Sequence, residues 1–250
     1  MDPRSVPVRF SHLKQMARSP AHYRYALEHS RPDSAALRLG RLVDLLMFEQ
    51  AAPLVFDGSR RGKAWDAFKA EHDGADIFTA SELEDAEPIA ASFNRPEHAR
   101  ALSLLRSGER QKRITWNWLG RDCAGTPDVC GQYLIDLKTT RSAQPDAFRR
   151  DALRYAYHAQ LAWYRNGMLL SGLQPPAQCY IVAVETSAPY PITVHRLTER
   201  AIDMGERLCR VWMEQLLVCE ESGHWPGYCE SELDFDIDTE LELTFGEEAA

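Results

Sequence analysis

The stretch that decides the fold of this chain reads Gly125-Thr126-Pro127-Asp128, then seven residues, then Asp136-Leu137-Lys138-Thr139-Thr140. Side chains alternate along a β-strand, so Asp136 and Lys138 point to one face of the second segment. Asp128 belongs to the preceding segment, across a turn at Gly131. We therefore expect two neighbouring strands that bring two carboxylates and an ammonium group together.

The residue types in this group suit phosphodiester hydrolysis. Two converging carboxylates make an oxygen-rich site for Mg²⁺ or Mn²⁺. The ammonium group of Lys138 can orient or deprotonate the attacking water and neutralise charge that develops on a phosphate. An Asp-x-Lys pattern alone is more often an ordinary solvated strand face, so this interpretation needs support from elsewhere in the chain.

Support comes from the helix expected after this strand. Tyr157, Gln160 and Tyr164 are spaced so that they share one helical face. An amide and two phenols on that face can reach a phosphate or a water. The alternative is an aromatic core face that contains a hydrogen-bonded glutamine.

The rest of the chain predicts an α/β fold in which a mixed sheet is flanked by helices. Helices are expected at about 34–49, 82–107, 146–168 and 198–222. Strands are expected at 113–118, 123–130 and 133–138 as an antiparallel meander, and at 178–185 and 192–197. We expect one domain over 1–250, with a helical part at about 10–110, a core at about 111–229 and an acidic segment at about 230–250.

Together these motifs resemble the RecB-type branch of the PD-(D/E)XK nucleases, which have a restriction-endonuclease-like core. In that resemblance Asp128 and Asp136 are the two acids, Lys138 is the lysine, and Gln160 with Tyr164 is the Q-x-x-x-Y motif. More narrowly, the chain resembles the RecE-like exonucleases of phages and prophages. The segments that carry this narrower likeness are Asp136–Thr140, Tyr155–Gln160, Val184-Glu185, Pro189-Tyr190 and Trp225–Tyr228.

The resemblance implies a metal-dependent deoxyribonuclease that hydrolyses phosphodiester bonds from the ends of linear double-stranded DNA, in the 5′-to-3′ direction. It implies Mg²⁺ or Mn²⁺ as the cofactor, held by Asp128, Asp136 and the backbone carbonyl of Leu137. It also implies a role in phage-type homologous recombination, a homo-oligomeric ring and a single-strand annealing recombinase as partner.

One position departs from the family pattern. Relatives place a metal-binding histidine on the second helix, in a G-x-x-x-H motif, whereas Gly40 is followed here by Asp44. A carboxylate oxygen is a competent Mg²⁺ ligand, so Asp44 is a candidate fourth ligand. A ligand role would also explain an acid on an apolar helical face, where a lone carboxylate is costly.

Several further residues are candidates for supporting roles. Glu185, at the end of the 178–185 strand, and Tyr157 are candidates for supporting the site, and a solvated strand-end acid is the alternative for Glu185. Candidate contacts to DNA phosphates are Arg141, Arg149, Arg150 and Lys63. Each of these four is individually more often a plain surface charge.

The net charge of −8 is unusual for a DNA-binding protein, but its distribution explains most of it. Residues 230–250 contain nine acids and no Lys or Arg, which leaves 29 basic and 28 acidic residues in the rest of the chain. A near-neutral body can still gather basic residues around one channel. The acidic segment is expected to be a solvated edge strand and tail, with partner binding or repulsion of DNA as the alternative.

The six cysteines are widely spaced and form no CxxC pair, so free, buried thiols are expected. No cysteine precedes Cys123, which argues against the iron–sulfur cluster that some relatives carry. No apolar run is long enough to cross a membrane, and the N-terminus has no signal-peptide pattern. A cytoplasmic location without membrane association is therefore expected.

Two other functions fit parts of the sequence. The Asp44 replacement and the excess of acids would suit a catalytically silent subunit that binds DNA ends or supports assembly. The same core residues would also suit a structure-specific or single-strand-specific endonuclease, which, unlike an end-requiring exonuclease, should cut circular single-stranded DNA.

Overall fold

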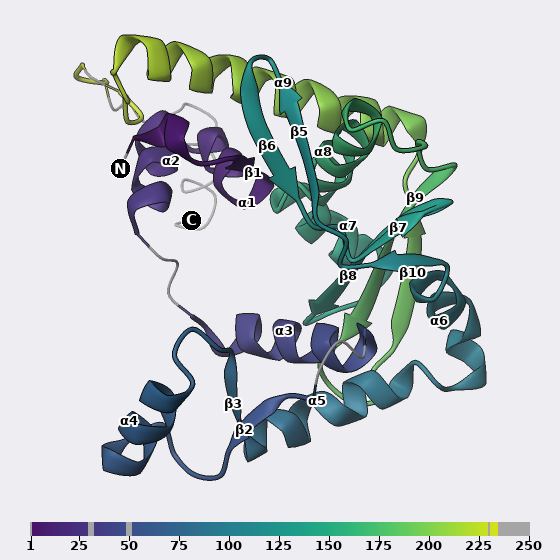
Figure 1. Cartoon of the computed structure of the whole chain (residues 1–250). Coiled ribbons are helices and arrows are strands. Elements are labelled where there is room, and N and C mark those ends of the chain that lie inside the picture. The colour runs from purple at the N-terminus through teal and green to yellow at the C-terminus, as the bar shows by residue number, and fades with distance from the viewer. Residues whose placement is uncertain (1, 30–32, 49–51, 230, 235–250) are drawn as a thin grey trace, which may run out of the picture.

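A five-stranded mixed sheet forms the centre of the computed structural model, which describes residues 2–29, 33–48, 52–229 and 231–234. Its strand order is β10 (Ile192–Arg196), β9 (Gln178–Glu185), β8 (Tyr133–Thr140), β7 (Val129–Gly131) and β4 (Gly108–Arg110). The β8–β9 pair is parallel and the other three pairs are antiparallel. The predicted fold class, a mixed sheet flanked by helices, is confirmed (Figure 1).

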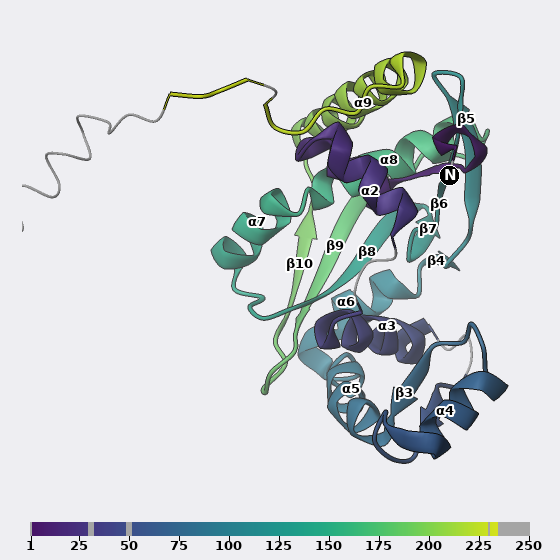
Figure 2. The ribbon, with the colours of Figure 1, turned by 90° about the vertical axis from the view of Figure 1, so that its left-hand side faces the viewer.

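The two faces of β8 differ in chemistry because its side chains alternate. Ile135 and Leu137 belong to an apolar cluster on one face, together with side chains of β9. The helices on that face are α3 (Ala35–Phe48), α5 (Ala80–Ser92) and α6 (Ala99–Leu105). Asp136 and Lys138 point to the other face, which α8 (Tyr157–Leu170) covers. The long helix α9 (Glu199–Ser222) packs on the outer side of α8 (Figures 1 and 2).

The predicted antiparallel meander is divided between two sheets, which corrects the single-sheet prediction. β5 (Ile114–Trp118) and β6 (Arg121–Gly125) pair with each other and, through β6, with the N-terminal β1 (Val8–Arg9). The chain leaves this three-stranded sheet at Gly125 and enters the five-stranded sheet at Val129. Pro127 lies between them, and it has no N–H with which to continue a strand ladder.

Two predicted helices are each divided as well. The helix expected at 146–168 is α7 (Pro145–Arg154) followed by α8, with Ala156 between them in the left-handed conformation at φ 56°. The stretch 82–107 forms α5 and α6, separated by the short η3 (Pro96–His98). Neither division was predicted, although Pro96 is a helix-breaking signal.

A smaller unit extends from the face that α3 and α5 cover. It contains the two-stranded parallel sheet of β2 (Leu54–Phe56) and β3 (Ile77–Thr79), and α4 (Gly62–Glu71). α5 begins with a capping box, in which Thr79 and Glu82 bond each other's backbone N–H groups. This unit forms the lower part of the molecule in Figure 1.

The N-terminal helices are held against the end of α9. They are η1 (Pro3–Ser5), α1 (Phe10–Leu13), η2 (Lys14–Ala17) and α2 (Pro20–Glu28). After α9, Trp225 stacks on Tyr23 with ring centroids 5.9 Å apart, and Ala21 N–H donates to the Pro226 carbonyl at 3.0 Å. The turn after α9 is therefore packed against α2.

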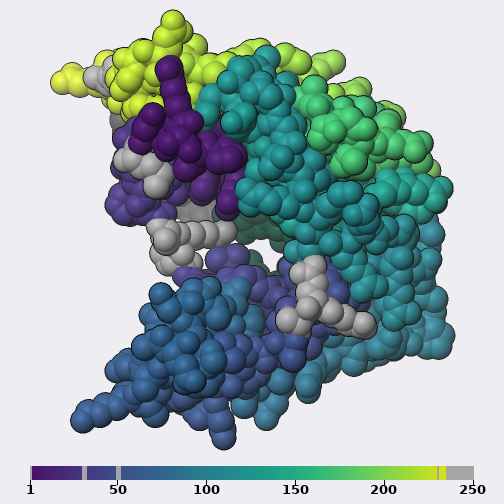
Figure 3. Space-filling view, in the orientation of Figure 1, coloured from purple at the N-terminus to yellow at the C-terminus, as the bar shows by residue number. Residues whose placement is uncertain are grey.

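The space-filling view shows a deep hollow between two parts of the molecule. The N-terminal helices and α9 lie on one side of the hollow. The smaller unit, together with α3 and α5, lies on the other side (Figure 3). The predicted edge strand within 230–250 falls almost entirely outside the described residues. No helix in the described part of the chain is long and apolar enough to cross a membrane.

The cysteine prediction is confirmed for five residues and wrong for one. Cys123, Cys130, Cys179, Cys209 and Cys219 are free and buried. Cys229 is exposed, which corrects the prediction for this residue.

Candidate active site

The predicted Asp136 and Lys138 lie side by side on β8, on the face toward α8. Asp136 is 1% exposed, and Lys138 Nζ lies 2.5 Å from Asp136 Oδ2. Among the described residues, this ion pair is the contact that Asp136 Oδ2 makes, and the atom has no other hydrogen-bond partner. A buried carboxylate held this way depends on nearby positive charge.

Asp128 joins the pair through the backbone of β8. Its Oδ2 accepts a hydrogen bond of 2.7 Å from the Leu137 N–H. That N–H is available because β7 pairs with β8 only as far as Ile135. Burial raises the pKa of Asp128 well above its usual range, and the charges of Asp136 and Asp44 raise it further. The predicted convergence of two acids and a lysine is therefore present.

A side chain of α8 donates a hydrogen bond to the carboxylate of Asp136. Gln160 Nε2 donates to Asp136 Oδ1 and to the Tyr164 hydroxyl, each at 3.1 Å. Burial, followed by the charge of Asp136, raises the pKa of Tyr164, so its phenol stays neutral. Gly125 leaves room for this ring, because a Cβ there would lie 2.7 Å from Tyr164 ring carbons. Sequence spacing thus predicted a helical face that contacts β8 at Asp136.

Tyr157 contacts the ammonium group rather than the carboxylate. Lys138 Nζ lies 5.0 Å from the centre of the Tyr157 ring, within the range of a cation–π interaction. Burial raises the pKa of Tyr157 above its usual value. The supporting role predicted for Tyr157 is therefore consistent with its position against Lys138.

Asp44 approaches from α3, opposite α8. Gly40 lets α3 come close to β8, since a Cβ there would lie 3.2 Å from Thr139 Oγ1. Burial raises the pKa of Asp44 to about 7; the charge of Lys138 lowers it and that of Asp136 raises it. Asp44 has no hydrogen bond or ion pair with any residue that the structure describes. Its electrostatic coupling to Asp136 and Lys138 places it beside the site.

Opposing effects set the charge state of Lys138. Burial lowers its pKa, but the charges of Asp136 and Asp128 outweigh burial and raise the pKa above the ordinary value. Lys138 is therefore a stable cation at neutral pH in this state. It is suited to orienting groups and balancing charge, and not to removing a proton from water.

The donor set fits a hard divalent cation in chemistry, although it is not a preformed cluster. Within the described ranges, no group of three or more Asp, Glu, His or Cys side chains is arranged to hold a metal ion as it stands. The oxygens are nevertheless of the kind that Mg²⁺ and Mn²⁺ prefer. Among the described residues, Asp136 Oδ2 is buried with the Lys138 ion pair as its contact, and burial raises the pKa of Asp44, whose ionised form a bound cation would stabilise.

The other predicted residues are arranged around this centre to different degrees. Glu185 Oε2 accepts from the Ala143 N–H at 2.9 Å and so holds the loop that follows β8. Arg141 lies in that loop, and Arg149 and Arg150 lie on α7; all three are exposed. Arg149 pairs with Asp146 at 3.3 Å. Lys63 is exposed on α4, in the smaller unit, apart from β8.

A basic pocket beside Gln160 and Tyr164 was not predicted from the sequence. The pocket has a volume of about 240 Å³ and its polar lining includes Arg9, Ser11, Lys14 and Arg113. The first three reach the site because β1 pairs in parallel with β6, a contact between residues far apart in the chain. Arg113 directly precedes β5, and no motif in the sequence marked it as part of a site.

Comparison with solved structures shows the fold in another protein. A "putative exonuclease" from Eubacterium rectale matches with a TM-score of 0.65 and 17% identity, over 96% of this chain and 93% of that one. A phage-related exonuclease from Haemophilus somnus is 16% identical over 86% of this chain and 96% of that one, with a TM-score of 0.36. An alkaline exonuclease from Laribacter hongkongensis is 13% identical over 72% of this chain and 89% of that one, with a TM-score of 0.30. Both TM-scores are too low to support an argument.

Comparison with the curated proteins finds no match. Among family models, the one described as "PDDEXK-like domain of unknown function (DUF3799)" matches residues 9–233, which include every strand and helix of the site. The resemblance to PD-(D/E)XK proteins inferred from the sequence is therefore confirmed, and the chain belongs to this PDDEXK-like family.

Proposed function

We propose that the protein is a metal-dependent deoxyribonuclease that hydrolyses phosphodiester bonds from the ends of linear double-stranded DNA. The observation that carries the proposal is the continuous polar cluster around Asp136. Lys138 contacts one oxygen of this carboxylate, Gln160 donates to the other, and Asp128 is fixed to the adjacent backbone N–H. A purely structural strand face would not require so many buried ionisable groups.

Each residue of the cluster has a distinct role in this proposal. Asp128, Asp136, the Leu137 carbonyl and Asp44 would hold Mg²⁺ or Mn²⁺, which when bound would polarise the scissile phosphate. Lys138, as a cation, orients the attacking water and balances charge on the phosphate oxygens. Gln160 fixes the orientation of Asp136 through its 3.1 Å hydrogen bond.

The basic pocket supports DNA as the substrate. Arg9 and Arg113 are exposed and line the pocket together with Gln160 and Tyr164. Arginine side chains near a hydrolytic centre are suited to bind the phosphates that flank the scissile bond. Arg141, Arg149 and Arg150 would extend this contact along α7, whereas the position of Lys63 on α4 would require the DNA to reach the smaller unit.

The finer features of the activity rest on the likeness to RecE-like exonucleases. These are the 5′-to-3′ direction, the role in phage-type recombination, the single-strand annealing partner and the ring-shaped homo-oligomer. They stay predictions, as does the supporting role of Glu185. The division of the chain into one domain with an acidic C-terminal segment also stays a prediction.

The decisive experiment measures nucleotide release from linear duplex DNA with Mg²⁺ or Mn²⁺. Wild type is compared with Lys138→Ala and with the matched control Lys69→Ala, which removes an exposed lysine on α4. We expect release by wild type and by the control, loss in Lys138→Ala, and no attack on a covalently closed duplex circle.

Other outcomes would select the alternatives. Duplex binding without release under either metal would contradict the nuclease and indicate a silent end-binding subunit. Cleavage of circular single-stranded DNA would instead indicate an endonuclease that uses the same residues.

A further inference from the structure

The outward face of α9 carries a regular apolar stripe. Met204, Val211 and Val218 are 48%, 54% and 64% exposed, although α9 buries its opposite side on α8. They are seven residues apart, so they lie in one line along the helix. α9 has 24 residues and runs along the rim of the molecule with this side free (Figures 1 and 2).

The charged residues that border this stripe are positive in the N-terminal half of α9 and negative in its C-terminal half. The exposed residues beside its N-terminal half include Arg200 and Arg207, and those beside its C-terminal half include Glu214 and Glu221. Among the residues that the structure describes, none of these four has an ion-pair partner. Their spacing of seven residues places all four on the same flank of the stripe.

A second α9 laid antiparallel satisfies both patterns at once. A two-fold axis at Val211 places this residue against its own copy and Met204 against Val218 of the second copy. Antiparallel helices bring equivalent flanks together, so Arg207 faces Glu214 of the second copy. Arg200 faces Glu221 of the second copy in the same way.

We infer that α9 is a self-association surface and that its partner is a second copy of this chain in antiparallel orientation. The contact is isologous, so it closes at two copies, unlike the head-to-tail contacts that build a ring. Because α9 lies on the outer side of α8, the hollow and the Asp136 cluster stay open in the pair. The inference does not depend on the proposed nuclease activity.

The contact is expected to be weak because one helix supplies it. The helix is about 36 Å long and the stripe from Met204 to Val218 covers about 21 Å of it, so the contact buries an area at the low end for specific interfaces. The dimer should therefore dissociate in the micromolar concentration range.

The test uses single charge reversals and their mixture. Arg207→Glu and Glu214→Arg each create two repulsive pairs per dimer, so each should weaken self-association about tenfold in sedimentation equilibrium. Mixed in equal amounts, the two variants should pair with each other about as well as wild type, since both contacts are then between opposite charges. The double variant should also recover wild-type association.

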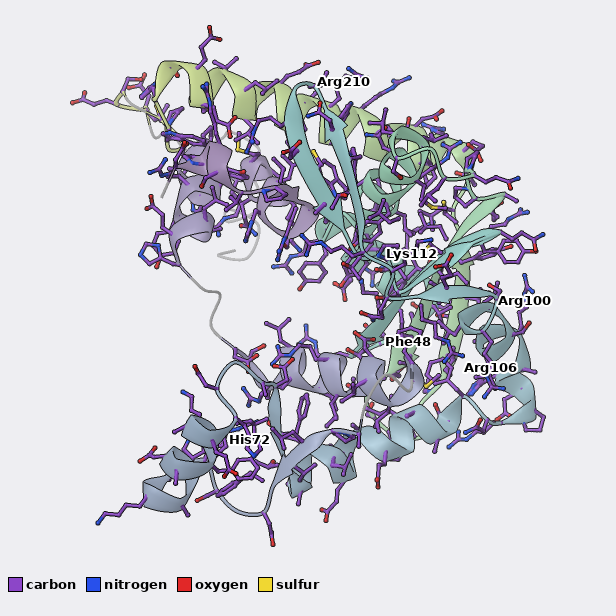
Figure 4. All side chains as sticks on the ribbon, viewed as in Figure 1. Phe48, His72, Arg100, Arg106, Lys112 and Arg210 are labelled. Atoms are coloured by element: carbon purple, nitrogen blue, oxygen red, sulfur yellow. The ribbon has the colours of Figure 1, made fainter. Side chains whose placement is uncertain are left out.

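The matched control is Arg106→Glu, an exposed arginine after α6 that lies apart from α9 (Figure 4). It should associate like wild type, and the thermal unfolding midpoint of every variant should confirm that it folds. A monomeric wild type at concentrations well above the micromolar range would overturn the inference. An oligomer of any size that is unaffected by both single reversals would overturn it as well.

Discussion

Two helices offer polar groups to the same carboxylate of β8, and they do so in different ways. From α8, Gln160 is fixed by hydrogen bonds to Asp136 and Tyr164. From α3, Asp44 is coupled to Asp136 and Lys138 only by charge, and burial raises its pKa to about 7. The α8 side is complete as it stands, whereas the α3 side presents a buried carboxylate that has no hydrogen bond or ion pair with any described residue. This difference suggests that α8 fixes the geometry of Asp136 and that α3 responds to a cation.

The largest expected effect comes from removing the group that both helices share. Asp136→Asn keeps the size of the side chain and an oxygen for Gln160 but removes the charge. We expect turnover to fall by about 10² to 10⁴-fold, since the metal and Lys138 both lose their partner. Nucleotide release at saturating DNA measures this. Release within tenfold of wild type would mean that Asp136 is only structural.

The comparison of the two helices becomes sharpest in a paired measurement of metal dependence. Asp44→Ala should raise the Mg²⁺ concentration needed for half-maximal activity by about 10 to 100-fold, with much of the maximal rate recovered at high Mg²⁺. Gln160→Ala should lower the maximal rate at every Mg²⁺ concentration, since Asp136 Oδ1 loses its donor. If the two variants gave the same Mg²⁺ profile, the division of roles between α3 and α8 would be wrong.

A smaller effect is expected on the pH dependence of metal-free stability. The pKa of Asp44 is about 7 in the folded protein against an ordinary value of 3.8. Between these values the folded state binds more protons than the unfolded state, so this contribution to stability decreases as pH rises. The free energy of unfolding should be lower by about 2 kcal/mol at pH about 7.5 than at pH about 5.5 on account of Asp44.

This pH effect is measured by thermal unfolding with a metal chelator present. Asp44→Asn should remove a difference of about 6 °C in the unfolding midpoint between the two pH values. Asp128 shifts in the same direction and should leave a residual slope. Added Mg²⁺ should reduce the slope in wild type, because the cation binds the deprotonated carboxylates. An unchanged slope in Asp44→Asn would contradict the assigned cause.

The sequence predicted most of the site because most of it depends on local periodicity. Strand alternation placed Asp136 and Lys138 on one face of a strand, and helical spacing placed Gln160 and Tyr164 on one face of the following helix. Neither depends on how distant segments pair. The role proposed for Asp44 came mainly from the family likeness, which supplied the position where a ligand was expected, and from the cost of an acid on an apolar helical face.

The features that the sequence did not predict have two causes. Some depend on pairing between strands far apart in the chain, and others on backbone conformations that the residue type at that position does not indicate. Arg9 and Ser11 reach the basic pocket only because β1 pairs with β6, more than a hundred residues away. The chain turns between α7 and α8 at Ala156, which takes a left-handed conformation without being glycine. An alanine in that position gives no sign of a helix boundary.

The last prediction compares the two glycines that let α8 and α3 approach the site. At Gly125 a Cβ would lie 2.7 Å from the ring of Tyr164, which Gln160 holds in place, so Gly125→Ala should lower the free energy of unfolding by about 1–3 kcal/mol. At Gly40 the nearest atom is the Thr139 hydroxyl at 3.2 Å, a contact that a small shift relieves. Gly40→Ala also gains about 0.5–1 kcal/mol in helix propensity, so its net effect should be close to zero.

Chemical unfolding of the two variants measures this difference, and activity at limiting Mg²⁺ gives a second readout. Gly125→Ala should lower the maximal rate, because displacement of Tyr164 disturbs Gln160 and through it Asp136. Gly40→Ala should change mainly the Mg²⁺ requirement, because it moves α3 and with it Asp44. Equal losses of stability and of maximal rate in both variants would show that α3 and α8 hold the site in the same way, and the contrast between a fixed side and a cation-responsive side would then fail.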